Sequence, residues 1–474
     1  MSKYNAIVIG SGPNGLTAAI ELIRNGLKVL IVEGSETIGG GTRTGELTLN
    51  GFQHDYCSAV HPMGLLSPYF KQLPLSEFGL KWIYPEASIA HPLDNEPTLL
   101  LTKSMEETSK YLGKDTKTWE NTFQYFEKNG ASLLEDALKP IGIPNHPLLF
   151  MKFGLKAFLP AKTFANLTFK EKQAKALFAG CAAHSVLPLD FLFTSGVGLI
   201  FAITGHMENW PIALGGSNGI TNSLAAYFKS LGGVIQTSKW VHSIGDLPEA
   251  DYYLFDTDPK QMAEIAGSEL PQGYKNRLVK YNYGPGAFKV DWALSGPIPW
   301  KDKNTLKAST VHIGGTMEEI ANSERMAWQG KHCEKPFVLL CQQSMFDDTR
   351  APKGKHTGYA YCHVPNGSTK DMTNEIEDQV ERFAPGFKDI ILKRHITNTA
   401  DFQKYNPNFF GGAITGGAAN FSQLFTRPVA RFNPYSTPNP KIFICSASTP
   451  PGGGVHGMCG YWAAQSILKK MKRN

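Results

Sequence analysis

The amino-acid sequence predicts an α/β protein in which a parallel sheet carries an inserted domain of mixed helices and strands. Three observations support this prediction. The chain begins with a strand, a glycine turn, a helix and a second strand within residues 4–32. A glycine loop, an amphipathic helix and a strand recur within residues 210–256, and a last strand, glycine loop and helix close the chain. Helical and mixed segments separate these units, so the sheet domain is expected to be discontinuous.

We expect residues 1–90, 208–275 and 425–474 to form the sheet domain, and residues 91–207 and 276–424 to form the inserted domain. A chain of 474 residues, 42% of them hydrophobic, is long enough for both. The formal net charge of +6 is spread along the chain and does not indicate nucleic-acid binding. The basic tail, residues 468–474, reads as a solvated helix end, with contact to an anionic membrane as the alternative.

The cysteines and the longest apolar segment bear on where the protein resides. The seven cysteines are odd in number and none forms a C-x-x-C pair, which argues against a disulfide framework or a zinc ribbon. We therefore expect reduced cysteines, no metal site and a cytoplasmic protein. The apolar residues 191–205 are fewer than the roughly 20 that span a membrane, so they predict a buried helix or pocket wall. A surface that dips into a membrane is the alternative.

The first unit follows from local patterns. Residues 4–9 (YNAIVI) form a short run of branched apolar residues typical of a buried strand. Residues 16–25 have apolar side chains at helical spacing, and Gly26 follows as a stop signal. Residues 28–32 (KVLIV) predict the second strand. Two strands joined by so short a helical connection are expected to be parallel, with a right-handed crossover.

The remaining elements are predicted in the same way. Residues 100–205 are mainly helical, with prolines at 140, 144 and 147 as interruptions. Periodicity and turn residues predict helices over 104–112 and 118–138, a glycine loop and helix over 210–231, a strand pair over 234–244, strands over 250–256, 287–294, 337–342 and 441–445, and a last helix through residue 470.

The turn GSGPNG contains Gly10, Gly12 and Gly15 in the spacing G-x-G-x-x-G, with Pro13 and Asn14 between them. It follows a strand, opens a helix and precedes an acidic residue, Glu33, at the end of the next strand, which is the Rossmann-like dinucleotide-binding pattern. The first glycine allows the tight turn, the second lets the backbone approach a pyrophosphate, and the third lets the helix pack on the strand. The helix N-terminus attracts the phosphates. Glu33 is expected to bind the adenosine ribose and to disfavour NADP.

A second glycine cluster follows Glu33 in the run TIGGGTRT, residues 37–44. Its Gly40, Gly41, Thr42 and Arg43 fit a flavoprotein better than a nicotinamide enzyme, because such runs pass near the pyrophosphate. The glycines at 215–219 and 411–417 lack the spacing or the strand-to-helix context of a second fingerprint. We therefore predict one dinucleotide site, of the flavoprotein kind, and no separate nicotinamide domain.

Four segments in order resemble the phytoene desaturase-related flavoproteins, within the larger group that contains the amine oxidases: GSGPNG, GGGTRT, WPIALGGSNGITNSLAAYF and IFICSASTPPGGGVHGMCGYWAA. The runs DYCSAVHP and PGGGVHGMCGYWAA most resemble a subgroup named after a vertebrate pyridine nucleotide-disulfide oxidoreductase-domain protein. The resemblance implies bound FAD and a fold of the two-dinucleotide-binding-domain flavoprotein type. It also implies that the loop with Gly453, Gly454, Val455 and His456 lies beside the flavin and that the backbone of Val241 contacts adenine.

In such a protein a substrate C–H bond is held over flavin N5, which accepts a hydride, and a base takes the adjacent proton. The residues that could serve as this base are His61, Tyr56, His184, Glu208 and His456, of which His61 is preferred because it follows the FAD segment. Arg43 is expected to neutralise charge near the flavin. Apolar residues 150–159 and 191–203 are expected to line a pocket for a polyene, an isoprenoid or a lipid-like substrate, with oxygen or a quinone as electron acceptor.

Three alternatives remain open. A polyene isomerase or saturase would use reduced FAD. An amine oxidase would need a lysine near flavin N5 and an aromatic cage, and the sequence identifies neither. A catalytically silent flavoprotein with an interaction role would keep the same cofactor motifs.

Overall fold

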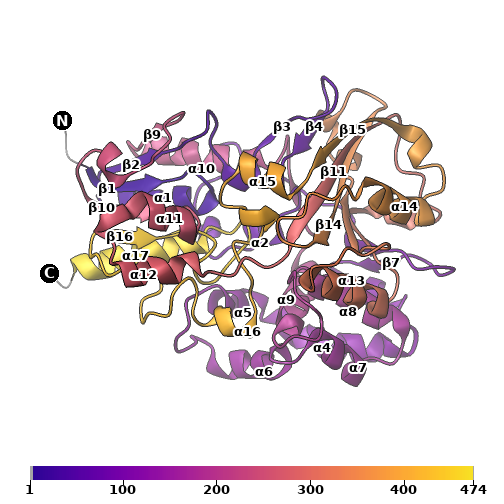
Figure 1. The fold of residues 1–474 in the computed structure, drawn as a ribbon. Helices are drawn as coiled ribbons and strands as arrows, with labels where there is room; N and C mark the ends of the chain where they lie inside the picture. Colours follow the sequence, from indigo (N-terminus) through magenta and orange to yellow (C-terminus); the bar gives the residue numbers. More distant parts are fainter. Residues whose placement is uncertain (1–3, 473–474) are drawn as a thin grey trace.

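Two large sheets organise the computed structural model, which describes residues 4–472 (Figure 1). The last two residues of the basic tail lie outside the described part. The first sheet is parallel throughout and has the strand order β16-β10-β1-β2-β9. Its strands are β1 (Tyr4–Ile9), β2 (Val29–Val32), β9 (Val234–Gln236), β10 (Ala250–Phe255) and β16 (Ile442–Ile444).

Helices cover both faces of the parallel sheet. Along β1, Ala6 and Val8 pack with α1 (Pro13–Arg24), α10 (Asn218–Ser230) and α17 (Met458–Met471). The alternate residues Ile7 and Ile9 pack with α11 (Pro259–Ala266) and α12 (Gln272–Val279) on the other face. Both faces of the central strands are therefore buried, which explains the apolar runs in β1, β2 and β16. The predicted Rossmann-like architecture is confirmed.

The second sheet is mixed and has the strand order β15-β11-β14-β13-β12-β6-β7. Only β6 and β12 pair in parallel; the other neighbours are antiparallel. Its strands are β6 (Ala87–His91), β7 (Leu99–Leu101), β11 (Gly286–Leu294), β12 (Ala308–Ile313), β13 (Val338–Cys341), β14 (His356–Val364) and β15 (Ile391–Thr397). Short pairs join β3 (Thr44–Glu46) to β4 (Gln53–Asp55) and β5 (Trp82–Ile83) to β8 (Ile212–Ala213).

The mixed sheet is also covered on both faces. One face packs on α14 (Thr373–Phe383), and the other packs on a helical layer that includes α8 (Lys172–Ala183) and α13 (Met317–Trp328). The remaining helices are α2 (Pro62–Leu65), α3 (Met105–Ser109), α4 (Thr116–Lys128), α5 (Gly130–Ala137), α6 (Pro147–Ala157), α7 (Ala161–Thr168), α9 (Thr194–Met207), α15 (Thr399–Tyr405) and α16 (Phe421–Leu424).

Three local predictions differ from the structure. The strand pair over 234–244 was wrong: only β9 forms, and the chain turns at Ser238, which has a positive φ of 54°. The single helix over 118–138 is two helices, because the chain breaks at Asn129, where Met207 packs against Gly130. The domain boundary expected at residue 90 falls within β6, which belongs to the mixed sheet.

The two segments expected to line a pocket behave differently. Residues 191–205 supply most of the buried helix α9, and Val197 and Phe201 line the main cavity, as predicted. Residues 150–159 fall mainly in α6, and none of them lines that cavity. Four of them line a second, more open pocket instead: Lys152, Leu155, Lys156 and Leu159. Helix α6 buries Leu149 and Phe153 on one side and exposes its opposite side, because only one face has a helical neighbour.

The helices described between residues 4 and 472 include none with both the length and the apolar character needed to cross a membrane.

Candidate active site

The N-terminus of α1 meets the ends of β1 and β10 at the glycine turn. Gly10 has a φ of 105°, which a side chain would strain. A Cβ on Gly15 would lie 2.3 Å from the carbonyl oxygen of Gly10, so only glycine lets the helix approach the strand this closely. The N–H of Gly15 donates to Oδ2 of Asp256, at 2.8 Å. The turn therefore has the close packing that the fingerprint predicts.

Asp256 was not predicted as a site residue. It follows β10 directly and lines the cavity beside the glycine turn. Burial raises the pKa of its carboxyl group to about 8, although the N–H groups of Gly15 and Gly12 oppose the shift. The carboxyl group is therefore mainly protonated at neutral pH. An acidic residue at the end of a predicted buried strand was the available signal in the sequence.

Glu33 is oriented by three short hydrogen bonds. Its carboxylate accepts from the N–H of Ser11 at 2.9 Å, from the hydroxyl of Ser11 at 2.6 Å and from the N–H of Ser35 at 2.9 Å. Arg43 pairs with it at 3.4 Å and donates to the carbonyl of Thr37 at 2.8 Å. Arg43 thus fastens the turn after β2 to Glu33, and both residues line the cavity.

The glycines near the C-terminus fit a crowded loop. Gly452 and Gly454 have φ values of 116° and 129°. A Cβ on Gly453 would lie 2.3 Å from the carbonyl oxygen of Thr415, so this glycine admits a neighbouring loop of the protein itself. All three glycines and Val455 line the cavity. The glycines therefore serve both the cavity wall and the packing behind it.

These elements enclose one cavity of about 590 Å³. It begins at the glycine turn and Glu33 and extends between the two sheets to a chamber beside the mixed sheet. The predicted cofactor residues that line it are Gly10, Gly12, Pro13, Asn14, Glu33, Gly40, Gly41, Thr42, Arg43, Val241, Gly453, Gly454 and Val455. Gly15 lies behind the wall, as its packing role requires. His456 does not line the cavity.

The five candidate bases are not brought together. His61 and His184 line the cavity. His456 is buried, and its Nδ1 accepts from the N–H of Met458, at 3.0 Å. Tyr56 does not line the cavity, although it stacks on Tyr405, which does. Glu208 forms an ion pair with Lys103 in a region open to solvent. The structure therefore leaves His61 and His184 as the candidates that a bound substrate could reach.

His61 is held in one tautomer. Its Nε2 lies 2.7 Å from the hydroxyl oxygen of Ser217, whose single hydrogen is donated to the carbonyl of Ser58, at 2.6 Å. The hydrogen between His61 and Ser217 must therefore belong to the imidazole. Burial lowers the pKa of His61 to about 4, so the ring is neutral at neutral pH.

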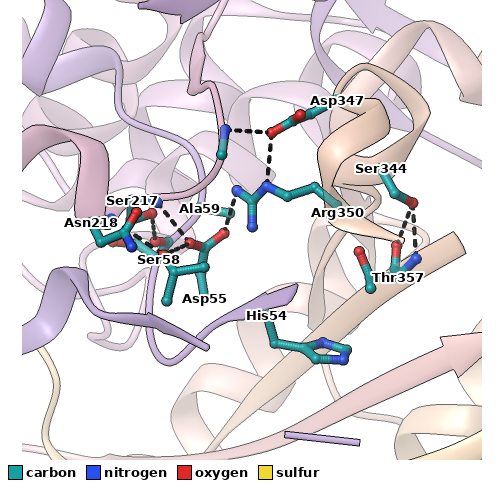
Figure 2. Close-up of polar contacts among 12 residues, drawn as sticks. His54, Asp55, Ser58, Ala59, Ser217, Asn218, Ser344, Asp347, Arg350 and Thr357 are labelled. Carbon is teal, nitrogen blue, oxygen red and sulfur yellow. Dashed lines mark hydrogen bonds and ion pairs between the residues drawn. The ribbon is translucent and has the colours of Figure 1, made fainter. Parts of the chain in front are cut away.

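A buried charge network positions Ser217 (Figure 2). Asp55 accepts from Arg350 at 2.9 Å and from the N–H of Ser217 at 2.8 Å, and Asp347 accepts from Arg350 at 2.9 Å and from the N–H of Gly215 at 2.8 Å. Burial alone would raise the pKa of Asp55, but the Arg350 charge and the Ser217 N–H lower it below the usual range. The network joins β4, the loop before α10 and the turn after β13.

The far chamber contains a lysine that the sequence reasoning missed. Lys289 is buried on β11 and lines the chamber. Its ammonium group pairs with Asp291, donates to the carbonyl of Asp55 at 3.0 Å and lies 4.3 Å from the ring centre of Tyr359. A lysine within a fully buried strand was the signal in the sequence. The other side chains of the chamber are mainly apolar or aromatic: Val197, Phe201, Trp210, Thr310, Leu339, Cys341, Tyr359 and Tyr361.

Known proteins share this arrangement. Residues 8–73 match the family model described as an NAD(P)-binding Rossmann-like domain. A limonene dehydrogenase chain of Castellaniella defragrans is 31% identical, over 100% of this chain and 96% of that protein. The chain belongs to the oxidoreductase family of this limonene dehydrogenase chain.

Two further proteins are similar to this chain over nearly its whole length. The pyridine nucleotide-disulfide oxidoreductase domain-containing protein 2 of Rattus norvegicus is 24% identical, over 99% of this chain and 94% of that protein. The structure of putrescine oxidase with bound putrescine matches with a TM-score of 0.63 and 16% identity, over 100% of both chains. At that identity the structural likeness establishes the fold alone.

The charge network predicts a large effect on stability. Replacing Arg350 by Met leaves Asp55 and Asp347 buried without their cation, and we expect the free energy of unfolding to fall by about 3–5 kcal/mol. Urea unfolding measures this change. As a control, Arg325→Met removes a partly exposed pair with Asp190 and should cost less than about 1 kcal/mol. Equal losses in the two variants would contradict the assignment.

Proposed function

We propose that the chain binds FAD and oxidises an apolar substrate at carbon, in a reaction of the desaturase or dehydrogenase type. The observation that carries the proposal is the continuity of the cavity. One end presents a dinucleotide fingerprint, and the other end is a chamber of mainly apolar and aromatic side chains. A flat redox cofactor anchored at the first end would reach toward the second.

The residues at the fingerprint end fit FAD. Gly10 and Gly12 keep the wall of the cavity free of side chains, and the α1 N-terminus offers its N–H groups to a pyrophosphate. Glu33 is held in place to accept hydrogen bonds from ribose hydroxyls. The protonated Asp256 adds no negative charge beside the phosphates at neutral pH. When bound, FAD would supply a two-electron acceptor for a hydride.

The far chamber fits an apolar substrate better than a cation. The carboxylic acids that line the cavity are Glu33, Asp256 and Asp258, all at the fingerprint end of the described lining. In the chamber, Lys289 already pairs with Asp291. An ammonium substrate would therefore find no free carboxylate, whereas a polyene, isoprenoid or lipid-like hydrocarbon would contact Phe201, Trp210 and Leu339. The name of the similar limonene dehydrogenase chain agrees with a hydrocarbon substrate.

Amine oxidation is the second candidate, because Lys289 and the rings of Tyr359 and Tyr361 supply the lysine and the aromatic surface that an amine oxidase would need. The putrescine oxidase likeness is consistent with it at the level of fold. Oxygen or a quinone is our proposed electron acceptor, since the sequence carries one dinucleotide fingerprint. A reduced-FAD-dependent isomerase or saturase and a silent flavoprotein with an interaction role remain alternatives that the spectrum below separates.

We further propose a peripheral membrane contact at the exposed face of α6. Leu148, Met151 and Leu155 are 71%, 57% and 73% exposed, and Lys152 and Lys156 lie on the same helix. From the end of α6, the ring of Phe158 contacts Phe193, which stacks with Phe421 of α16. Leu424 of the same short helix lines the cavity. An apolar substrate leaving a bilayer would thus meet a continuous apolar surface near the cavity.

An anaerobic visible spectrum tests the proposed function. The purified protein is expected to show a flavin band that limonene bleaches and that NADH, NADPH and putrescine leave unchanged. Bleaching by putrescine alone would favour the amine oxidase, and bleaching by a nicotinamide would favour the reduced-FAD isomerase or saturase. If no substrate bleaches the band and a stable protein partner is found, the interaction role is favoured.

Two glycine variants test whether the flavin band depends on the glycine turn. Gly15→Val brings a side chain against Gly10 and is expected to abolish the flavin band. Gly154→Ala is the matched control, because a Cβ there meets no atom within 4 Å. A colourless wild-type protein that FAD cannot reconstitute would sink the proposal.

The protonated Asp256 predicts a pH dependence of FAD binding. Above its pKa of about 8, the ionised carboxylate repels the pyrophosphate, so we expect binding to be about tenfold weaker at pH 9 than at pH 7. Asp256→Asn should remove most of this dependence while retaining the flavin, and Glu264→Gln should leave it intact. Fluorescence titration with FAD measures the affinity. An unchanged pH dependence in Asp256→Asn would refute the explanation.

The α6 face predicts binding to anionic liposomes. The wild type should co-sediment with phosphatidylcholine vesicles that contain phosphatidylserine, and Leu148→Gln/Leu155→Gln should weaken partitioning at least about tenfold, since two large apolar side chains no longer insert. Leu392→Gln, an exposed leucine on β15, is the control. Equal sedimentation of both variants would argue against this face.

A further inference from the structure

Three histidines, two of them fully buried, form a chain that leads away from the far chamber. His184 ends α8 and lines the cavity, where its ring stacks on Phe201 with centres 4.5 Å apart. Behind it lies His312 on β12, and beyond that His91 on β6. His312 and His91 are fully buried. Neither the cofactor site nor the charge network uses these three side chains.

The contacts define where hydrogens can sit. Nε2 of His184 lies 3.0 Å from Nε2 of His312, so one of these two atoms carries the shared hydrogen. Nε2 of His91 lies 2.8 Å from the carbonyl oxygen of Gly315, which can only accept. His91 therefore carries its hydrogen on Nε2, and its Nδ1 is a bare acceptor.

Two ring nitrogens within the histidine chain have no hydrogen-bond partner. Nδ1 of His312 and Nδ1 of His91 are sealed from solvent and have no partner among residues 4–472. Both face the α-carbon of Gly180, where a Cβ would lie 2.5 Å from the first nitrogen and 3.2 Å from the second. Two unpartnered nitrogens beside one glycine are costly to bury unless a proton or a water passes between them.

The surroundings keep the chain neutral at rest. Burial lowers the pKa of His184 to about 3 and of His91 to about 4, and it lowers the pKa of His312 as well. The charge of His363, which is paired with Glu324, further disfavours a cation at His184. The charge of Glu319, which also pairs with Arg382, favours a proton at His91. Glu319 therefore favours a proton at the His91 end of the chain.

We propose that His184 is the base that receives the substrate's proton, and that His312 and His91 carry this proton from the chamber toward Gly315. This inference rests on the proposed function. The substrate loses a hydride, with two electrons, to the bound flavin. A neighbouring C–H bond then breaks, and its electron pair forms the new double bond. That proton goes to Nδ1 of His184, which makes no hydrogen bond within the described chain.

The transfers conserve protons at every step. As Nδ1 of His184 gains the proton, its Nε2 hydrogen moves to Nε2 of His312. The Nδ1 hydrogen of His312 moves to Nδ1 of His91 through one water beside Gly180, because these two nitrogens are not in hydrogen-bond contact with each other. His91 then holds the charge, with its Nε2 hydrogen on Gly315. The proton returns along the chain when the proposed acceptor, oxygen or a quinone, is reduced, because that reduction takes up one proton together with the hydride. A weak neutral base is sufficient, because loss of the hydride makes the adjacent C–H bond strongly acidic.

Nitrogen-15 NMR of the FAD-bound protein with ring-labelled histidine tests the chain without turnover. We expect His91 as the Nε2–H tautomer and a shared hydrogen between His184 and His312. His91→Gln should change the tautomer populations of His184, although the rings of His91 and His184 do not contact each other and each contacts the ring of His312, which lies between them. His206→Gln is the matched control, because His206 is equally buried and burial also lowers its pKa to about 4. Unchanged His184 signals in His91→Gln would overturn the relay.

Kinetics provide the second readout. With limonene or putrescine, whichever bleaches the flavin, His184→Gln is expected to slow bleaching at least about 100-fold. His91→Gln and Gly180→Ala should slow it less and shift its pH profile, while His206→Gln should not. Flavin content and thermal unfolding exclude variants that fail to fold. If neither compound bleaches the wild type, the proposed function fails, whereas the NMR result still decides the relay. Normal rates in His184→Gln would exclude it as the base.

Discussion

The geometry of the site depends on the ion pairs that the side chain of Arg350 forms. This side chain is fully buried and has two carboxylates as partners, Asp55 and Asp347. Because an unpaired ion would be very costly at this position, the three groups can be buried only together. Their remaining hydrogen bonds fix the backbone at Gly215 and Ser217, just before α10 of the parallel-sheet domain. Arg350 itself follows β13 of the mixed sheet.

The network of Arg350, Asp55 and Asp347 fixes how the two ends of the cavity lie relative to each other. Ser217 receives the hydrogen of His61, and Asp55 presents its carbonyl oxygen to Lys289. The side chains of His61 and Lys289 lie in the cavity wall between the two sheets. The two ends of the cavity also differ in polarity. The carboxylic acids that line it lie near the glycine turn, whereas the far chamber contains paired or neutral groups. One end suits a cofactor with phosphates, and the other suits a hydrocarbon.

The sequence predicted those parts of the site that are local in the chain. The turn from Gly10 to Gly15 and its approach to β1 depend on residues within one strand-helix unit, so spacing alone was sufficient. Asp256, Lys289 and His312 were missed because each acquires its role from neighbours hundreds of positions away or on another strand. The same limit applies to α6, where the sequence showed an apolar segment but could not show which face would find a partner. His456 was misplaced because one peptide unit decides whether a loop side chain faces the cavity or the protein interior.

A chamber with mainly apolar and aromatic walls creates a problem that the histidine chain addresses. Side chains such as Phe201, Trp210 and Leu339 cannot accept a proton from the substrate. An ionised carboxylate could serve as base, but it would need a permanent partner in such surroundings. Neutral imidazoles are cheaper to bury, and each can accept at one nitrogen while it donates at the other. A proton can therefore leave through His184 without any charge residing in the chamber before the substrate arrives. The unpartnered nitrogens beside Gly180 are then the cost of keeping that route open.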